Sequence, residues 1–117
     1  MDLIAKAAEA LEPISAEGIV VQQGWYDKSL HARHVTLWTL SDTPDASSDD
    51  DLEIETGMIQ VTIFSQEDEV DLAGRIRKLM TAAGWTWIAG DQDDTMNDGG
   101  IIIKPQRFMY QEEKENE

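Results

Sequence analysis

The chain has 117 residues, 41% of them apolar, and its 24 acidic and nine basic residues give a net charge of −15 at pH 7. This length fits one domain with a modest core. The charge argues against a nucleic-acid-binding protein, because phosphate contacts need clustered lysine and arginine, and it disfavours an anionic membrane surface. The absence of cysteine excludes disulfides, thiolate zinc sites and cysteine nucleophiles, and it suits the reducing cytoplasm. We expect neither a signal peptide nor a transmembrane helix, because no apolar run is long enough.

The first half of the chain predicts one helix followed by two strands and an acidic loop. Apolar residues fall on one helical face over residues 2–12, where Asp2 can cap the start and Pro13 stops the helix. Short apolar runs predict strands at 19–21 and 33–40. Residues 41–51 predict an exposed, mobile hairpin loop, since like charges repel and nothing in this segment can enter a core.

A third strand is predicted at 52–64. Its apolar positions change phase at Gly57-Met58, which predicts a β-bulge there or two short strands that meet at a bend.

A second helix is predicted at 67–83. Ser65 and Asp68 resemble a capping box, and Gly84 is a suitable C-cap. The basic cluster on this helix, Arg75, Arg77 and Lys78, is interpreted as part of its solvated face.

The remaining segments predict a strand at 85–89, an acidic turn at 90–100 and a last strand at 101–110. Pro105 places this last strand at a sheet edge or breaks it. Together the elements predict a single α+β domain over 1–110 with a mainly antiparallel sheet, two helices packed on one face, and the order α-β-β-β-α-β-β. Residues 111–117 are expected to be a disordered acidic tail.

The motifs that carry chemistry are incomplete. Asp91, Asp93 and Thr95 match the first ligand positions of a calcium loop, but Met96 and Ile102 stand where glycine and a bidentate glutamate are required. His31 and His34 are three apart, so in a strand they point to opposite faces, and both are interpreted as surface residues rather than metal ligands.

No serine lies in a nucleophile-elbow motif, and no glycine-rich loop could hold a phosphate. The sequence therefore predicts a protein that is not an enzyme and uses no metal or cofactor.

The tryptophans are candidates either for core packing or for an interface, where exposed tryptophan is enriched. Trp85 and Trp87 share one face of a strand. We predict interface roles for three tryptophans and for four acids of the loop, which should become ordered on assembly: Trp25, Trp38, Trp87, Asp45, Asp49, Asp50 and Asp51. Deleting residues 43–50 is expected to leave folding intact and to alter assembly.

Residues 52–110 form an ordered succession of motifs. Ile59-Gln60-Val61-Thr62-Ile63-Phe64 precedes an amphipathic helix, then come Ala83-Gly84-Trp85, an acid-rich turn and a closing strand that ends near Phe108-Met109-Tyr110. This succession resembles the tail-terminator and tail-completion proteins of long-tailed phages and prophages, in which a similar helix ends at Gly-Trp and an Asp/Thr-rich loop leads to an edge strand. The helix from Leu3 to Leu11 also fits.

The resemblance implies a structural protein that forms a homo-oligomeric ring, often hexameric, around a tail lumen. Its expected partners are other copies of itself and a tail-tube or head-completion protein, with no direct nucleic-acid or membrane binding. Its expected location is the virion tail, or the host cytoplasm during assembly. An acidic lumen would let DNA pass without binding, because like charges repel.

The alternative is an acidic DNA mimic or inhibitor that occupies the nucleic-acid site of another protein. Such a mimic needs a continuous row of carboxylates on one ordered surface, whereas many acids here fall in residues 42–51, residues 91–98 and the tail.

Overall fold

The computed structural model describes residues 2–24, 33–46, 52–90 and 101–115, with only the backbone described at 41–46, 52–55 and 113–115. Over these ranges the protein is α+β, as predicted. The elements in chain order are α1 Leu3–Ala10, α2 Glu12–Ala16, β1 Val20–Gln23, β2 His34–Ala46, β3 Leu52–Ser65, α3 Val70–Ala82, β4 Thr86–Gly90 and β5 Ile102–Glu115.

The strands form one five-stranded sheet in the order β1-β2-β3-β5-β4. The pairs β2–β3, β3–β5 and β4–β5 are antiparallel, as predicted for most of the sheet. At one edge β1 joins β2 in parallel, with Val20 opposite His34. Both α1 and α2 precede β1, so neither helix connects the two parallel strands.

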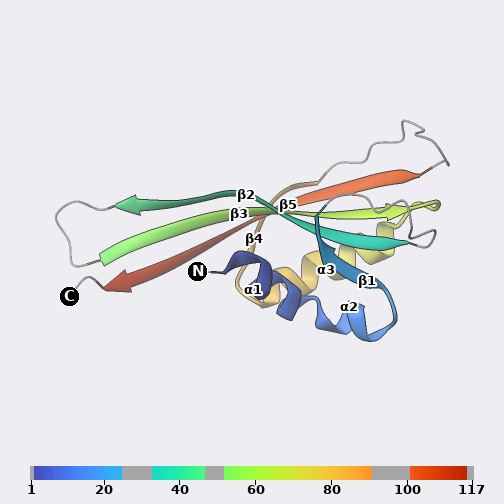
Figure 1. Ribbon diagram of the computed structural model, residues 1–117, viewed down its shortest axis with the longest axis horizontal. Coiled ribbons are helices and arrows are strands. Elements are labelled where there is room, and N and C mark those ends of the chain that lie inside the picture. Colours follow the sequence, from blue (N-terminus) through green and yellow to red (C-terminus); the bar gives the residue numbers. More distant parts are fainter. Residues whose placement is uncertain (1, 25–32, 47–51, 91–100, 116–117) are drawn as a thin grey trace.

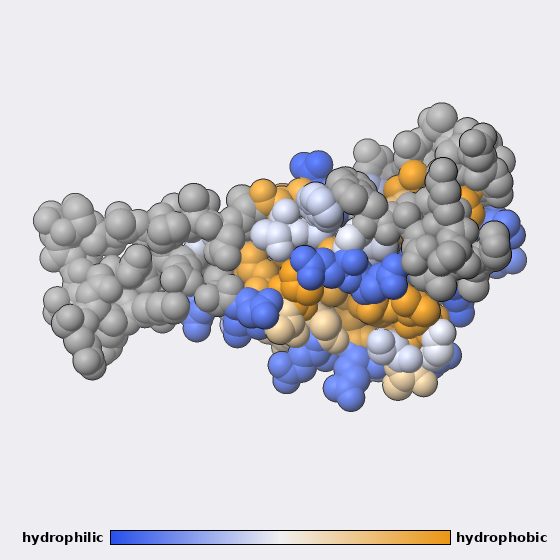
Figure 2. All heavy atoms as spheres, in the orientation of Figure 1, coloured by the Kyte–Doolittle hydropathy of each residue, from blue (hydrophilic) through white to orange (hydrophobic). Residues whose placement is uncertain are grey.

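The helices pack on one face of the sheet (Figure 1), with α1 against β2 and β3 and α3 against β4 and β5. Figure 2 shows apolar side chains gathered over this helix-covered half, with hydrophilic residues around them. The core combines apolar side chains of the helices and the strands, among them Ala7, Leu11, Ile14, Val35, Leu37, Ile59, Val61, Ile76, Met80, Trp85 and Phe108.

The N-terminal helical region continues past the predicted stop. Asp2 does cap α1, since its side chain accepts a hydrogen bond from the Ala5 N–H at 3.0 Å. Pro13, however, lies in the first turn of α2. The expectation that Pro13 ends the helix was wrong, because proline is well tolerated in a first turn, where its missing N–H has no helical partner to lose.

The second long helix begins later than predicted, and the predicted capping box does not form. Ser65 Oγ accepts from the Glu67 N–H at 3.1 Å and donates to Glu69 Oε1 at 3.1 Å. Asp68 is turned toward β5, where Lys104 Nζ donates to it at 3.4 Å. The Ser65 and Asp68 side chains therefore bond to Glu69 and Lys104 and do not form the predicted capping box.

The end of α3 confirms the role predicted for Gly84. Its φ is +99°, and the Gly84 and Trp85 N–H groups donate to the carbonyls of Thr81 at 3.1 Å and Met80 at 3.0 Å. This is the Schellman arrangement, which reverses the chain after a helix. It directs Trp85 into the core, where the residue is 3% exposed.

The irregularity predicted at Gly57-Met58 lies instead on the neighbouring strand. Pairing of β3 with β5 is continuous, whereas the β2 register shifts between Thr39 and Ser41. Gly57 lies directly under α1, since a Cβ at this position would come within 2.7 Å of Leu3 Cδ2.

From Gly57 toward the start of β3, the sheet continues away from the helices as three strands, and no described helix covers this part (Figure 1). Residues 41–46 pair with 53–58, and residues 52–57 pair with 110–115. We call this extension, residues 41–46, 52–57 and 110–115, the acidic arm. The expectation that 41–46 belong to a loop was wrong, and β5 continues through five residues that were expected in the tail.

Pro105 does not break β5. It pairs with Thr62 of β3, and the described pairing with β4 ends one residue later, at Gln106 opposite Gly90. Pro105 thus lies at an edge of the described sheet on the β4 side, which is where a residue without an N–H is tolerated.

Candidate assembly surfaces

The two predicted tryptophan anchors that the structure describes do not lie together. Trp38 is 36% exposed and lies on the sheet face opposite the helices, because its neighbour Leu37 points into the core. Trp87 is half-buried and directly opposite Phe108, on the helix-covered face. The two side chains therefore belong to separate surfaces.

The other predicted anchors are described only in part. Asp45 lies in the acidic arm, where its backbone pairs with Ile54. Trp25, Asp49, Asp50 and Asp51 lie outside the described residues. Interface roles for all of these residues remain predictions.

The histidine interpretation needs one correction. His34 is buried, at 1% exposure, and stacks on Phe64 with ring centroids 5.2 Å apart. The surface assignment was wrong because the imidazole packs against the Phe64 ring, which is itself buried. His31 and most of the calcium-like loop lie outside the described residues. Among the residues that are described, no group of three or more His, Cys, Asp or Glu side chains could hold a metal ion.

A groove of about 320 Å³ lies between α3 and the β4–β5 edge; we call it the Trp87 groove. Its floor and walls combine apolar and cationic side chains from both elements, namely Val70, Ala73, Arg77, Trp87, Lys104 and Gln106. Val70 is 60% exposed here, at the residue where α3 begins.

Gln106 links the elements that form the groove. It is 6% exposed. Its Nε2 donates to the Ala73 carbonyl at 3.0 Å, and its Oε1 accepts from Trp87 Nε1 at 3.1 Å. One buried amide thus joins α3, β5 and β4, and it sets the position of the indole.

The Trp87 ring is held from two further sides. The Arg77 guanidinium lies 4.0 Å from the ring centroid, a cation–π contact. A Cβ at Gly90 would lie 3.2 Å from Trp87 Cζ2, so glycine leaves room for the ring. Arg77 is therefore part of the groove and not only of a solvated helix face, which sequence periodicity alone did not indicate.

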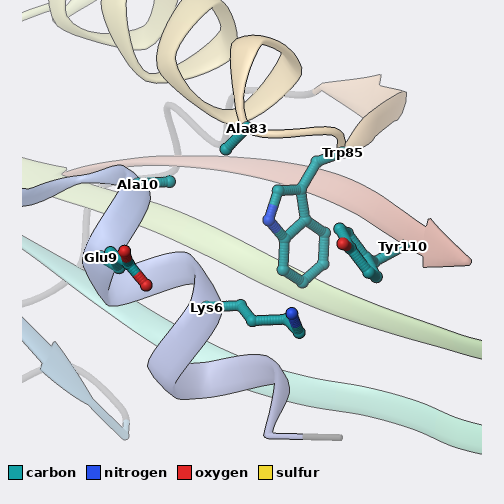
Figure 3. A pocket seen from close by; sticks show the side chains of 6 residues that line it. All are labelled: Lys6, Glu9, Ala10, Ala83, Trp85 and Tyr110. Atoms are coloured by element: carbon teal, nitrogen blue, oxygen red, sulfur yellow. The ribbon is translucent and has the colours of Figure 1, made fainter. Parts of the chain in front are cut away.

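A second hollow, of about 330 Å³, lies at the root of the acidic arm between α1, Trp85 and Tyr110. Figure 3 shows Lys6 extending toward Tyr110, with Glu9 farther along α1. Lys6 Nζ is 5.0 Å from the Tyr110 centroid, and the Trp85 and Tyr110 rings are 5.2 Å apart. The side chains that line the hollow include no nucleophile beside a base. Their contacts pack α1 against the start of the arm.

Ion pairs connect the helices to the sheet and to each other. Arg33 Nη1 lies 3.1 Å from Glu69 Oε2 and so ties the start of β2 to the start of α3. Arg75 forms an ion pair with Glu17 at the end of α2. The hydrogen bond from Arg75 lowers the pKa of Glu17, and the same bond raises the pKa of Arg75.

Within the described part of the chain, no helix is long and apolar enough to cross a membrane. No protein-family model matches the sequence, and no curated protein sequence matches it. The fold itself is shared with a solved structure, a chain from the virion of a native gene transfer agent particle. That chain is 12% identical, with a TM-score of 0.66, and the match covers 96% of this chain and 95% of the other.

Proposed function

We propose that the chain is a structural, non-enzymatic component of a phage or phage-like virion, and specifically a tail-terminator or tail-completion protein that forms a ring. The observation that carries this proposal is the likeness of fold to a virion chain over nearly the full length of both. The order of the strand, the helix, Gly84-Trp85 and the closing strand supports the tail-terminator assignment.

The shape and charge of the molecule support a place in a ring. Its principal extents are 53 × 28 × 23 Å, with the acidic arm projecting beyond the helices (Figure 1). Seven acids and one lysine lie in the arm: Asp42, Asp45, Glu53, Glu55, Glu112, Glu113, Glu115 and Lys114. Acids of the chain that face a lumen would repel DNA phosphates and keep the passage free of bound DNA.

The test is assembly with the tail-tube protein of the same genome. We expect the two purified proteins to co-sediment, and electron microscopy to show a ring at one end of the tube. We also expect the chain in purified particles by mass spectrometry. Absence from the particles together with no binding to the tube would refute the proposal.

A DNA mimic is the second candidate, and one observation favours it. Residues 41–46 and 110–115 are strands, so the backbone that carries the arm acids is part of the sheet and not of loops. A mimic would bind a basic partner in competition with double-stranded DNA. Binding to a tail tube would be insensitive to added DNA, and this competition assay separates the two functions.

A further inference from the structure

Two basic side chains line the Trp87 groove of a strongly acidic chain. Arg77 lies over the Trp87 ring, and Lys104 Nζ lies 3.4 Å from Asp68, whereas the whole chain carries a charge of −15. Val70 exposes 60% of its surface there, and the indole of Trp87 is only half-buried. Tryptophan and arginine together on an apolar surface are typical of the residues that dominate binding energy at protein interfaces.

We propose that the acidic arm of a second copy of this chain docks in the Trp87 groove. The inference rests on the self-association that belongs to the proposed function, and it names the two surfaces that meet. Arg77 and Lys104 would pair with arm carboxylates, while Val70 and the Trp87 ring would be covered by the arm's strands.

The arm cannot reach the groove of its own chain. Gln106, in the groove, and Glu113, in the arm, lie on the same strand β5. Seven residues at about 3.4 Å each separate them by about 24 Å. Because β5 is paired with β3 along this whole length, the arm cannot fold back, and docking requires another molecule.

Electrostatic repulsion between arms favours docking of an arm in the groove over docking of one arm on another. Seven acids against one lysine make two arms repel each other. A contact between two different surfaces of identical chains is heterologous, and its repetition closes into a ring when the rotation permits. The proposed contact is therefore of the kind that a ring-forming protein needs.

Zero-length cross-linking with isotopically mixed protein tests this contact directly. Full-length chains, half of them ¹⁵N-labelled, are mixed and treated with a carbodiimide, which joins a lysine amine to a carboxylate in direct contact. We expect mixed-label cross-links between Lys104 and peptides of the arm. Mixed-label cross-links that join other surfaces and leave Lys104 out would overturn the inference.

Charge variants give an independent readout by sedimentation equilibrium. Arg77→Glu is expected to weaken self-association at least about tenfold, which corresponds to about 1.4 kcal/mol. Lys78→Glu is the matched control, since it makes the same charge change on the next residue of α3 but lies outside the groove lining. Arg77→Gln provides a milder change if the reversal impairs folding.

Rescue then identifies the arm as the partner. Reversing two acids that lie directly opposite each other in the arm, Glu55→Lys with Glu112→Lys, should weaken association by itself and should recover part of it in the Arg77→Glu background. Equal effects of Arg77→Glu and Lys78→Glu, or no recovery, would refute the docking. If the Arg77→Glu chain enters particles like the unaltered chain, the inference fails while the proposed function stands. If the unaltered chain never enters particles, the proposed function itself fails.

Discussion

Gln106 is predicted to be a main stabilising contact between α3 and the β4–β5 edge, and Gln106→Leu tests this. Leucine has a similar volume and no polar atoms. The substitution removes two hydrogen bonds, to the Ala73 carbonyl and from the Trp87 indole. The surrounding backbone and apolar contacts stay in place.

The expected loss follows from the burial of the two partners. Each hydrogen bond contributes about 1 kcal/mol net, and a buried group left without a partner costs more. Ala73 lies within α3, so its carbonyl keeps its place in the helical backbone ladder. The Trp87 N–H loses its partner. We expect the free energy of unfolding to fall by about 2 kcal/mol, a large share of the stability of a small domain.

Urea unfolding followed by circular dichroism measures this change. Gln60→Leu is the control, because Gln60 is half-buried on the opposite sheet face and donates one hydrogen bond, to Thr62 Oγ1 at 3.0 Å. It should cost less than about 1 kcal/mol. Exchange of the Trp87 indole proton, followed by NMR, should accelerate in Gln106→Leu only. Equal losses in both variants, or unchanged indole exchange, would refute the reasoning.

Four further substitutions test contacts that hold the helices in place. Gly57→Ala should lower the free energy of unfolding by about 1–3 kcal/mol, because the added Cβ overpacks against Leu3. Gly74→Ala has open space at its Cβ and should stabilise α3 by about 0.5–1 kcal/mol. A loss at Gly57 no larger than that at Gly74 would contradict the contact with α1. Gly84→Ala should cost about 1–2 kcal/mol in thermal unfolding because φ is positive there, and an unchanged melting temperature would contradict this strain. The pKa of Glu17 is lowered in the folded state by its hydrogen bond with Arg75. Its contribution to stability is therefore present above the ordinary pKa of 4.5 and is lost as the pH falls through the folded pKa. Glu17→Gln should destabilise the fold at neutral pH but not in acid, and equal effects at both pH values would contradict the ion pair with Arg75.

Features that depend on neighbours in the chain were predictable. The cap at Asp2 and the C-cap at Gly84 involve contacts over three to five residues, and both form as predicted. The apolar periodicity of α3 and of the strands also follows from residues close in sequence. The α+β class and the mainly antiparallel sheet followed from these elements.

Features that depend on distant partners were not predictable in the same way. Residues 41–46 and 111–115 are acidic and polar, so by composition they indicate a loop and a tail. They are strands because each pairs with β3. Ser65 and Asp68 fit a capping box locally, but hydrogen bonds to Glu69 and Lys104 take their side chains elsewhere.

The sequence by itself determined the charge, the α+β class, the caps at Asp2 and Gly84 and the residue types that suit an interface, because these depend on composition and on local periodicity. Only the tertiary structure decided which of those residues meet. It separates Trp38 from Trp87 by placing them on opposite faces of the sheet. It joins Trp87 to Arg77 and Gln106, which come from three different elements. It also gathers the acids of three separate segments into one arm, because strand pairing brings together residues that are far apart in the chain.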